Sequence, residues 1–241
     1  MALQHFHLPS VEERCAYLAD MKSATEYRVL SGVTPAEHER LLELGWRHFG
    51  SQYFRPVCAA CQECLSLRIP VAEFKPSKSQ RRAAKRCGSL RVEVGLPTAD
   101  DQRLALFHAW HAMREQTRGW KPSVMTREEY EQCFCHPHPF SRELSYYEGD
   151  RLAAIGHVDL TPNAVSSAYF FYDPRLRPLG IGVASVLFEI QWALENGRSH
   201  LYLGYCVRAC PSTAYKAQFT PHEILVGRPE FSDMPVWRAV E

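Results

Sequence analysis

The stretch VSSAYFFYDPRLRPLGIGVASVLFEIQWALENGRSHLYLGY, residues 165–205, decides the fold expected for this chain. Residues 165–172 predict a strand, and a glycine turn at Gly180-Ile-Gly182 follows it. Residues 183–196 predict a helix that ends at Gly197, and residues 201–205 predict a short buried strand. A mixed α+β sheet with one crossover helix fits this order.

The surrounding segments extend the same pattern in both directions. Gly149-Asp150 joins two predicted strands into a hairpin that precedes the decisive stretch. Upstream, the cysteine-containing segment 53–64 is predicted to be a loop. Helices are predicted at 34–44, 77–85, 103–118 and 126–133, and strands at 65–71, 90–94, 144–148 and 151–160. A polar break at 97–101 predicts two domains, 1–97 and 98–241, the second carrying the mixed sheet.

Composition places the chain among ordinary globular proteins. It has 241 residues, of which 46% are hydrophobic and 23% charged, so it holds enough apolar material for a full core and is not expected to be disordered. No apolar run approaches the roughly 20 residues that a membrane-spanning helix needs. The first residues, MALQHFHLPSVEERC, lack the pattern of a secretory signal. We therefore expect a cytoplasmic protein.

Positive charge is concentrated in one segment. The chain has a net charge of +1, but the run FKPSKSQRRAAKRCGSLR (74–91) has seven basic residues and no acidic one. Within it, five cations recur at helical spacing and project from one face: Lys78, Arg81, Arg82, Lys85 and Arg86. Their mutual repulsion favours a polyanion partner, and the alternative is a helix that simply faces solvent.

The glycine turn is the second candidate site. In Arg177-Pro-Leu-Gly180-Ile-Gly182, backbone N–H groups would face an anion at the start of the following helix. The pattern resembles the acyl-CoA-binding signature of the GNAT acyltransferases, R-x-x-G-x-G/A. Glycines before a helix are also common simply as turn residues. The turn therefore indicates a phosphate or adenosine site without proving one.

Nine cysteines are many for a chain expected in a reducing compartment. Cys58, Cys61 and Cys64 are spaced three apart, and Cys15 is a candidate fourth ligand, a set suited to zinc or an iron–sulfur cluster. The alternative is a set of buried reduced thiols that pack as small hydrophobic groups. A second group, CFCHPH (133–138), has similar spacing but no evident partner.

Taken in order, these segments resemble the aminoacyl-tRNA–protein transferases, the bacterial leucyltransferases and their eukaryotic arginyltransferase relatives. The resemblance covers nearly the whole chain, and the blocks PSKSQRR and LGY…C…YK are its most specific part. The matching segments are Cys15-Ala-Tyr-Leu18, LLELGWRHFG (41–50), Tyr53-Phe-Arg-Pro56, Arg68-Ile-Pro-Val71, FKPSKSQRRAAKR (74–86), YFFYDP (169–174), Leu179-Gly180 and YLGYCVRACPSTAYK (202–216).

The resemblance implies a reaction. The family moves an aminoacyl group from charged tRNA to the N-terminal amine of a protein, which marks that protein for degradation by the N-end rule, and its C-terminal half is similar to the GNAT fold. The cysteine triplet looks like the bacterial branch, which typically moves leucine onto N-terminal Asp or Glu. Pro178-Leu-Gly180, Gly45-Trp-Arg-His-Phe-Gly50 and Thr213 depart from the family pattern, so arginine stays open as the transferred group.

The reaction divides the candidate residues among three tasks. The five cations of residues 78–86, with Gly180 and Gly182, would hold the tRNA. Arg47 or Arg68 would bind the acidic side chain of the acceptor. Tyr205, Tyr215 and Lys216 would line the transfer site and stabilise the developing oxyanion, with no evident general base. Alignment of an activated ester with an amine is expected to contribute most of the rate enhancement, and the chemistry itself needs no cofactor.

Two other function classes fit parts of the sequence. An acyl-CoA N-acetyltransferase of the GNAT class needs the glycine turn but neither the basic segment nor the cysteines. A non-catalytic tRNA-binding protein needs the basic segment but not the turn. The expected partners are aminoacyl-tRNA and proteins with N-terminal Asp or Glu, and neither DNA nor a membrane is expected.

Overall fold

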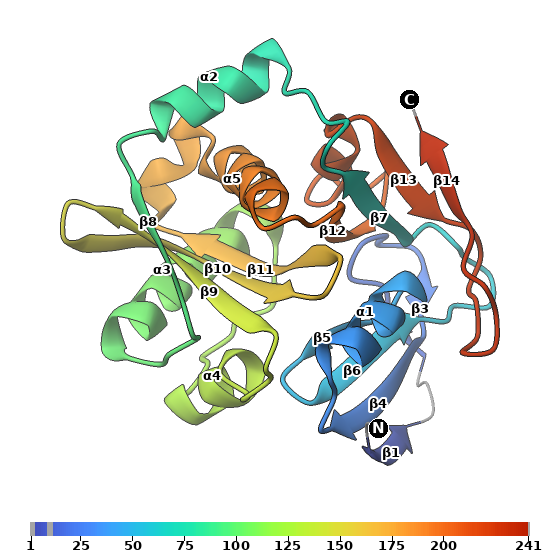
Figure 1. Cartoon of the computed structure of the whole chain (residues 1–241). Helices are drawn as coiled ribbons and strands as arrows, with labels where there is room; N and C mark the ends of the chain where they lie inside the picture. The colour runs from blue at the N-terminus through green and yellow to red at the C-terminus, as the bar shows by residue number, and fades with distance from the viewer. Residues whose placement is uncertain (1–2, 9–11, 241) are drawn as a thin grey trace.

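Two sheets form the framework of the computed structural model, which describes residues 3–8 and 12–240 (Figure 1). The larger has eight strands in the order β14-β13-β7-β12-β11-β10-β9-β8, and the smaller has four in the order β1-β4-β6-β5. The larger sheet comprises β7 Leu65–Pro70, β8 Arg91–Gly95, β9 Ser141–Glu148, β10 Arg151–Leu160, β11 Ala164–Tyr172, β12 His200–Cys206, β13 His222–Leu225 and β14 Trp237–Val240. The smaller comprises β1 Leu3–Leu8, β4 Thr25–Ser31, β5 Arg47–Phe49 and β6 Gln52–Pro56, and β2 Glu13–Arg14 pairs separately with β3 Lys22–Ser23.

The decisive stretch folds as its sequence predicts. Strands β11 and β12 pair in parallel, and α5 (Ile181–Glu195) is the crossover helix between them, preceded by the 3₁₀ turn η1 (Pro174–Leu179). The hairpin β9–β10 continues the sheet through antiparallel pairs. The α+β class, with a mixed sheet and one crossover helix, is therefore confirmed.

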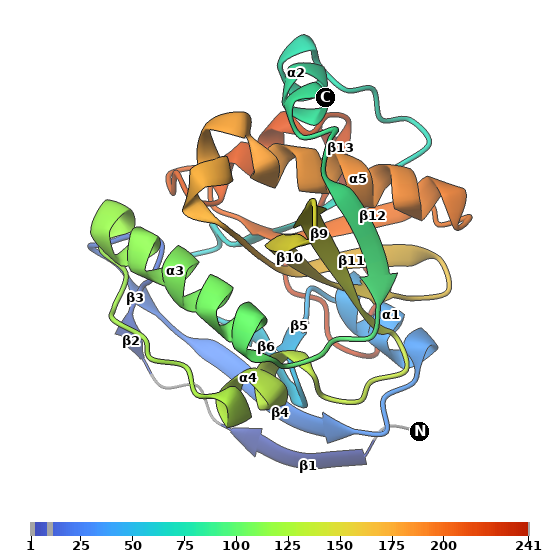
Figure 2. The ribbon, with the colours of Figure 1, turned by 90° about the vertical axis from the view of Figure 1, so that its left-hand side faces the viewer.

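Helices cover both faces of this sheet. Helix α5 lies on one face and α3 (Asp101–Arg118) on the other, with α2 (Lys78–Arg86) packed over α5 (Figure 2). The remaining helices are α1 Pro35–Glu43, α4 Arg127–Phe134 and the 3₁₀ turn η2 Ala214–Gln218. Within the described part of the chain, no helix combines the length and apolar character needed to cross a membrane.

Local capping signals placed three helices correctly. Thr34, Ser77 and Thr126 each accept a hydrogen bond from the backbone N–H three residues on, and the Glu or Gln at that position bonds back to the cap. These reciprocal capping boxes satisfy N–H groups that a helix start leaves free. They explain why α1, α2 and α4 begin where the sequence predicts.

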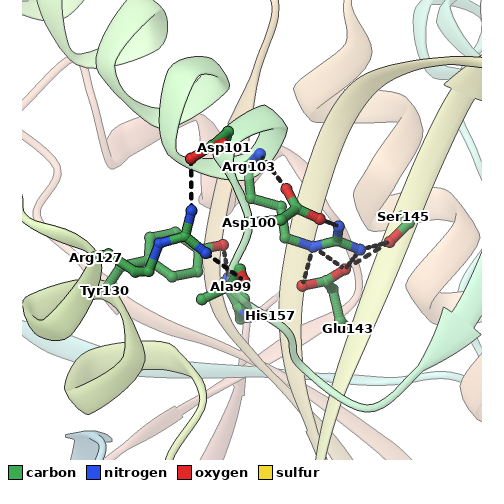
Figure 3. Close-up of polar contacts among 9 residues, drawn as sticks. All are labelled: Ala99, Asp100, Asp101, Arg103, Arg127, Tyr130, Glu143, Ser145 and His157. Atoms are coloured by element: carbon green, nitrogen blue, oxygen red, sulfur yellow. Dashed lines mark hydrogen bonds and ion pairs between the residues drawn. The ribbon is translucent and has the colours of Figure 1, made fainter.

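A buried ion pair fixes α3 to the sheet. The Arg103 guanidinium donates to both carboxylate oxygens of Glu143 on β9, from Nε at 3.0 and 3.2 Å, and it also bonds Asp100 (Figure 3). Glu143 is 1% exposed, so the loss of Arg103 would leave a buried negative charge without its ion-pair partner. Arg127 on α4 bonds Asp101, so α4 is held to the start of α3 (Figure 3). These contacts give α3 a defined position.

The N-terminal region differs most from the sequence prediction. Residues 53–64 were expected to be a loop, but Gln52–Pro56 is strand β6, paired with both β4 and β5. Strands β5 and β6 have three and five residues, so their periodicity is weak. Strands β7 and β8 lie before the boundary expected near residue 97 and yet belong to the large sheet. The division into domains at that point stays a prediction.

Candidate active site

A cavity of about 600 Å³ opens beside the glycine turn and strand β12. Its walls come from β5, β6, β11, β12, α3, the start of α5 and the segment around η2. The candidate residues Arg47, Gly180, Gly182, Tyr205, Tyr215 and Lys216 all line it. The structure thus brings together in one cavity residues that lie up to 169 positions apart in the sequence.

Two of the cations that line this cavity, Arg47 and Lys216, meet beside Gly204 at what we call the cationic end, and neither has a carboxylate partner in the part of the chain that the structure describes. Arg47 is 7% exposed; its guanidinium donates to the Trp46 carbonyl at 2.8 Å and to Ser66 Oγ at 2.9 Å, and its Nε has no partner. Lys216 Nζ donates to the Tyr205 carbonyl at 3.0 Å. A Cβ on Gly204 would lie 3.5 Å from both Arg47 Nε and Lys216 Nζ, so the glycine leaves room for the two charges.

The electrostatics of this cationic end favour an incoming anion. Burial lowers the pKa of Arg47. Burial, and then the Arg47 charge, lower the pKa of Lys216 to about 8. Burial is the first cause of both shifts, because it disfavours the charged form of each side chain. An anionic ligand group bound between the two side chains would stabilise both charges.

Another part of the cavity wall, which we call the aromatic end, is formed by tryptophan and tyrosine rings. Trp110 on α3 packs edge-on against Trp120 and Tyr169, and the Arg114 guanidinium lies 5.0 Å from the Trp110 ring centre. Sequence reasoning assigned no role to these residues, although two tryptophans and an arginine within eleven positions were visible. The aromatic end offers an apolar surface on which a ring or an aliphatic side chain can pack.

The glycine turn and the basic helix lie side by side. Gly180 has φ of 78°, and a Cβ on it would come within 3.2 Å of Ala83 Cβ on α2. Arg86 Nε donates to the carbonyl of Leu179 at 3.1 Å, which ties α2 to the turn. The five cations of α2 are exposed, and among the described residues none of them has an ion-pair partner. A polyanion held on α2 would therefore reach the mouth of the cavity.

Comparison with known proteins decides the family. Residues 13–82 match the model of the arginine-tRNA-protein transferase N terminus, and residues 102–226 match that of the C terminus. The chain belongs to the arginine-tRNA-protein transferase family. It is thus a tRNA-dependent aminoacyltransferase.

Named relatives extend the match over the full length. The chain is 35% identical to the aspartate/glutamate leucyltransferase of Campylobacter jejuni, over 95% of this chain and 96% of that one. It is 30% identical to that of Helicobacter hepaticus, over 98% of each. Among solved structures, L-PGS from Bacillus licheniformis aligns with a TM-score of 0.45 and 15% identity, over 59% of this chain and 45% of that one.

The two acceptor-binding candidates of the transferase differ in their surroundings. Arg68 on β7 bonds the Glu223 carboxylate at 2.5 Å and Tyr202 Oη at 3.1 Å, and it lies outside the cavity. Arg47 lies inside and has no carboxylate partner. The geometry therefore favours Arg47 for binding an acidic group.

The three catalytic candidates also separate. Tyr205 Oη donates its one proton to the Gly45 carbonyl at 2.7 Å, so this hydroxyl is not free for an oxyanion. Burial raises the pKa of Tyr215 to about 12, so its phenol stays protonated and able to donate. Tyr215 and Lys216 are thus better placed than Tyr205 to face the reacting atoms.

The cysteines line a second, smaller cavity of about 240 Å³ that shares Tyr17, Phe54 and Tyr205 with the first. Backbone N–H groups donate to two sulfurs, from Ala24 to Cys58 Sγ at 3.3 Å and from Tyr17 to Cys15 Sγ at 3.4 Å. All four candidate ligands line this cavity: Cys15, Cys58, Cys61 and Cys64.

These four sulfurs are not gathered into a closed set. Burial, and then the neighbouring Cys15, Cys58 and Cys61, raise the pKa of Cys64 to about 12, so the thiols lie near one another. Among the described residues, however, the group of three or more ligand atoms that all lie within 4.8 Å of one another is His38, His48 and Asp159. Metal binding at the cysteines stays a prediction.

Proposed function

We propose that this transferase moves leucine from charged tRNA to the N-terminal amine of proteins that begin with Asp or Glu, in the cytoplasm, and so marks them for N-end-rule degradation. One observation carries the proposal. Arg47 and Lys216 meet beside Gly204 without a carboxylate partner among the described residues, and another part of the same cavity wall is formed by the rings of Trp110 and Trp120 with Arg114 beside them.

The cationic end suits the acidic side chain of the acceptor. Arg47 and Lys216 would bind a single carboxylate through charge-assisted hydrogen bonds. The same two charges would lower the pKa of the adjacent α-amine, because a neighbouring cation disfavours the ammonium form. Recognition of the acidic residue and release of the amine's proton would then depend on the same two side chains.

The remaining walls favour a leucyl over an arginyl group. An arginyl side chain inside the cavity would need a carboxylate partner. Asp159 is the acid among the lining residues, and it already accepts hydrogen bonds from His38, His48 and Ser141. A leucyl side chain needs only an apolar surface such as that of Trp110 and Trp120. The names of the relatives agree with this choice.

The tRNA would bind across α2 and the glycine turn. The exposed cations Arg81, Arg82 and Lys85 would contact phosphates of the acceptor arm. The open space at Gly182, where a Cβ would meet no atom within 4 Å, would admit the terminal adenosine. The charged 3′ end would then enter the cavity between the turn and the aromatic end.

Positioning supplies most of the catalysis. The amine nitrogen attacks the ester carbonyl carbon, the bond from that carbon to the ribose oxygen breaks, and the proton lost by the amine ends on the leaving 3′ hydroxyl. The ester is already activated, so alignment is worth roughly 7 to 11 kcal/mol in favourable cases. Tyr215 would donate a hydrogen bond to the developing oxyanion. No cofactor takes part.

A transfer assay tests the proposal. Labelled Leu-tRNA and Arg-tRNA are each offered with peptides that begin with Asp, Glu, Asn or Gln, and acetyl-CoA replaces the tRNA in a parallel reaction. We expect leucine on the Asp and Glu peptides, and rejection of Asn and Gln by about 100-fold or more, because the amide leaves a buried cation unpaired. Comparable transfer to Asn peptides would refute carboxylate recognition. Preference for Arg-tRNA would refute leucine, and efficient use of acetyl-CoA would favour an N-acetyltransferase.

The cysteine cavity is proposed to hold zinc or an iron–sulfur cluster in a structural role. Four thiols around one cavity, two of them accepting backbone N–H groups, form a donor set suited to either. Metal analysis of protein purified without oxygen tests this, with Cys61→Ser as the variant and Cys206→Ser as the control. Equal metal content in both variants would refute metal binding by the four cysteines.

A further inference from the structure

A buried polar cluster joins the two sheets beside the transfer cavity. Asp159 on β10 is 2% exposed, and its Oδ2 lies 3.2 Å from His38 Nε2 and 3.0 Å from His48 Nε2. Its Oδ1 accepts from Ser141 Oγ at 3.0 Å. His48 belongs to β5 of the small sheet and directly follows Arg47. The cluster therefore connects the strand that carries Arg47 to the large sheet.

The hydrogen-bond partners define the protonation of His48. Its Nδ1 lies 3.0 Å from the carbonyl oxygen of Gly50, which can only accept. Its Nε2 faces the Asp159 carboxylate, which also only accepts. Both ring nitrogens must therefore carry a proton, and the ring is an imidazolium. Gly50 is fixed in this role because a Cβ there would lie 2.0 Å from the carbonyl oxygen of Gln132.

The other histidines of the cluster have partners that suit the neutral form. His38 Nε2 donates to Asp159, and its Nδ1 accepts from Tyr53 Oη at 3.4 Å. His138 Nε2 donates to the same Gly50 carbonyl at 2.8 Å. Burial lowers the pKa of His38 and of His138 to about 4. One carboxylate is thus matched by one imidazolium.

A divalent metal bound by His38, His48 and Asp159 is the competing arrangement. The three ligand atoms lie within 4.8 Å of one another, as such an ion would need. A divalent metal with one carboxylate and two neutral histidines would leave a net positive charge beside Arg47, a buried cation without a carboxylate partner among the described residues. The ion pair of the His48 imidazolium and the Asp159 carboxylate leaves no net charge there. The charge balance therefore favours the imidazolium.

We propose that His48 is a positioning residue, a buried imidazolium that fastens β5 to Asp159 and so holds the adjacent Arg47 guanidinium in the transfer cavity. The inference rests on the proposed role of Arg47 in binding the acceptor carboxylate. Without the second proton on His48, its Nε2 lone pair would face the Asp159 carboxylate, and β5 would shift. Arg47 would then lose its position in the cavity. The cations of α2 would keep theirs, because α2 is not part of β5.

The groups that face His48 determine how it titrates. They are Asp159 from β10, His38 from α1, Tyr53 from β6, His136 and His138 from the segment before β9, and Arg47 from its own strand. Burial opposes the charge on His48, but the Asp159 carboxylate and the Gly50 carbonyl outweigh it and raise the pKa. Acceptor binding should therefore weaken as the pH rises through this raised value.

Nitrogen NMR tests the protonation without reference to catalysis. With ¹⁵N-labelled histidine at pH 7.5, an ordinary histidine of pKa about 6.5 is about 90% neutral. We expect both nitrogens of His48 to be protonated in the wild type. In Asp159→Asn we expect one of them to be deprotonated, since the Asn amide can donate to Nε2. A singly protonated His48 in the wild type would overturn the proposal.

Kinetics test the positioning role. We expect His48→Gln to raise the KM for an Asp-initiated peptide at least tenfold, with little change in the KM for Leu-tRNA. His48→Arg, whose charge does not titrate, should restore part of the loss and reduce the rise in KM at high pH to the part that comes from deprotonation of Lys216. His222→Gln is the control, because His222 is also buried but bonds the Phe219 carbonyl away from the cavity.

The outcomes separate the two proposals. If the wild type moves no leucine to Asp peptides, the proposed function fails, and the NMR result still decides the state of His48. If transfer occurs but His48→Gln and His222→Gln change the peptide KM equally, the positioning role is refuted. Stoichiometric zinc lost in His48→Gln but kept in His222→Gln would identify a metal site instead.

Discussion

The transferase carries two groups of cations that differ in almost every physical respect. Those of α2 are exposed, number five and lie along one face of a helix. Arg47, which is buried, and Lys216, which is half-buried, line the cavity and share the space above Gly204. Water and salt screen the first group more than the second. The exposed group is therefore suited to holding a long polyanion, and the cavity pair to selecting one carboxylate.

Removal of the Arg47 charge is the most direct test of the difference between the two groups of cations. Arg47→Met keeps an unbranched side chain and removes the charge, so we expect kcat/KM for an Asp peptide to fall by about 30- to 1,000-fold, the equivalent of roughly 2 to 4 kcal/mol. Arg68→Met is the matched control, because it removes an arginine already paired with Glu223. It should lower the melting temperature without this loss of activity. Similar kinetic losses in both variants would contradict a special role for Arg47.

The α2 cations should show the opposite dependence on salt. Replacing Arg81, Arg82 and Lys85 together with Gln should weaken Leu-tRNA binding and reduce the slope of log affinity against log salt by roughly 2 to 3 units, if each contacts one phosphate. The KM for the peptide should not change. Arg238→Gln, an exposed cation on β14, is the control. An unchanged slope would show that α2 merely faces solvent.

The contact between the glycine turn and α2 predicts a smaller effect, on stability, when Gly180 or Gly182 is replaced. Gly180→Ala places a side chain at φ of 78° and 3.2 Å from Ala83 Cβ, so we expect a loss of about 1 to 2 kcal/mol in unfolding free energy. Gly182→Ala meets no atom within 4 Å inside α5 and should stabilise the helix by up to about 1 kcal/mol. Thermal unfolding of the two variants measures this difference. Equal changes would mean that α2 does not depend on the turn.

The ion pair of His48 and Asp159 predicts how stability depends on pH. The raised pKa of His48 adds stability that is fully present below about pH 6.5, the ordinary value, and is lost as the pH rises through the folded value. The unfolding free energy of the wild type should therefore decline at alkaline pH more than that of His48→Arg. Urea unfolding across pH 6 to 9.5 measures it. Parallel profiles would contradict an imidazolium at this position.

The sequence was sufficient for features encoded locally. Thr34, Ser77 and Thr126 mark helix starts through hydrogen bonds made within four residues. The glycine turn and α5 follow from a continuous stretch. The resemblance to the family supplied Arg47, Tyr215 and Lys216 as candidates, and the structure places them in one cavity.

Features that depend on tertiary pairing were out of reach. His48 and Asp159 lie 111 positions apart, and nothing local in either strand indicates that they meet. Strands β5 and β6 were missed because they have only three and five residues, too few for a clear alternation. Arg68 and Arg47 could not be told apart as acceptor ligands, because only the fold shows that Glu223 occupies the first.

The position of β7 has a consequence for how the chain is made. Pro70 at the end of β7 pairs with His200 on β12, 130 positions later, and Arg68 pairs with Glu223 on β13. During synthesis β7 leaves the ribosome long before either neighbour exists, so both its edges stay unpaired until the last fifth of the chain emerges. Its Leu67 and Ile69, which end up buried, need protection from aggregation throughout that interval. The transferase should therefore depend on chaperones that bind nascent chains, and slowing translation before β12 should lower its soluble yield.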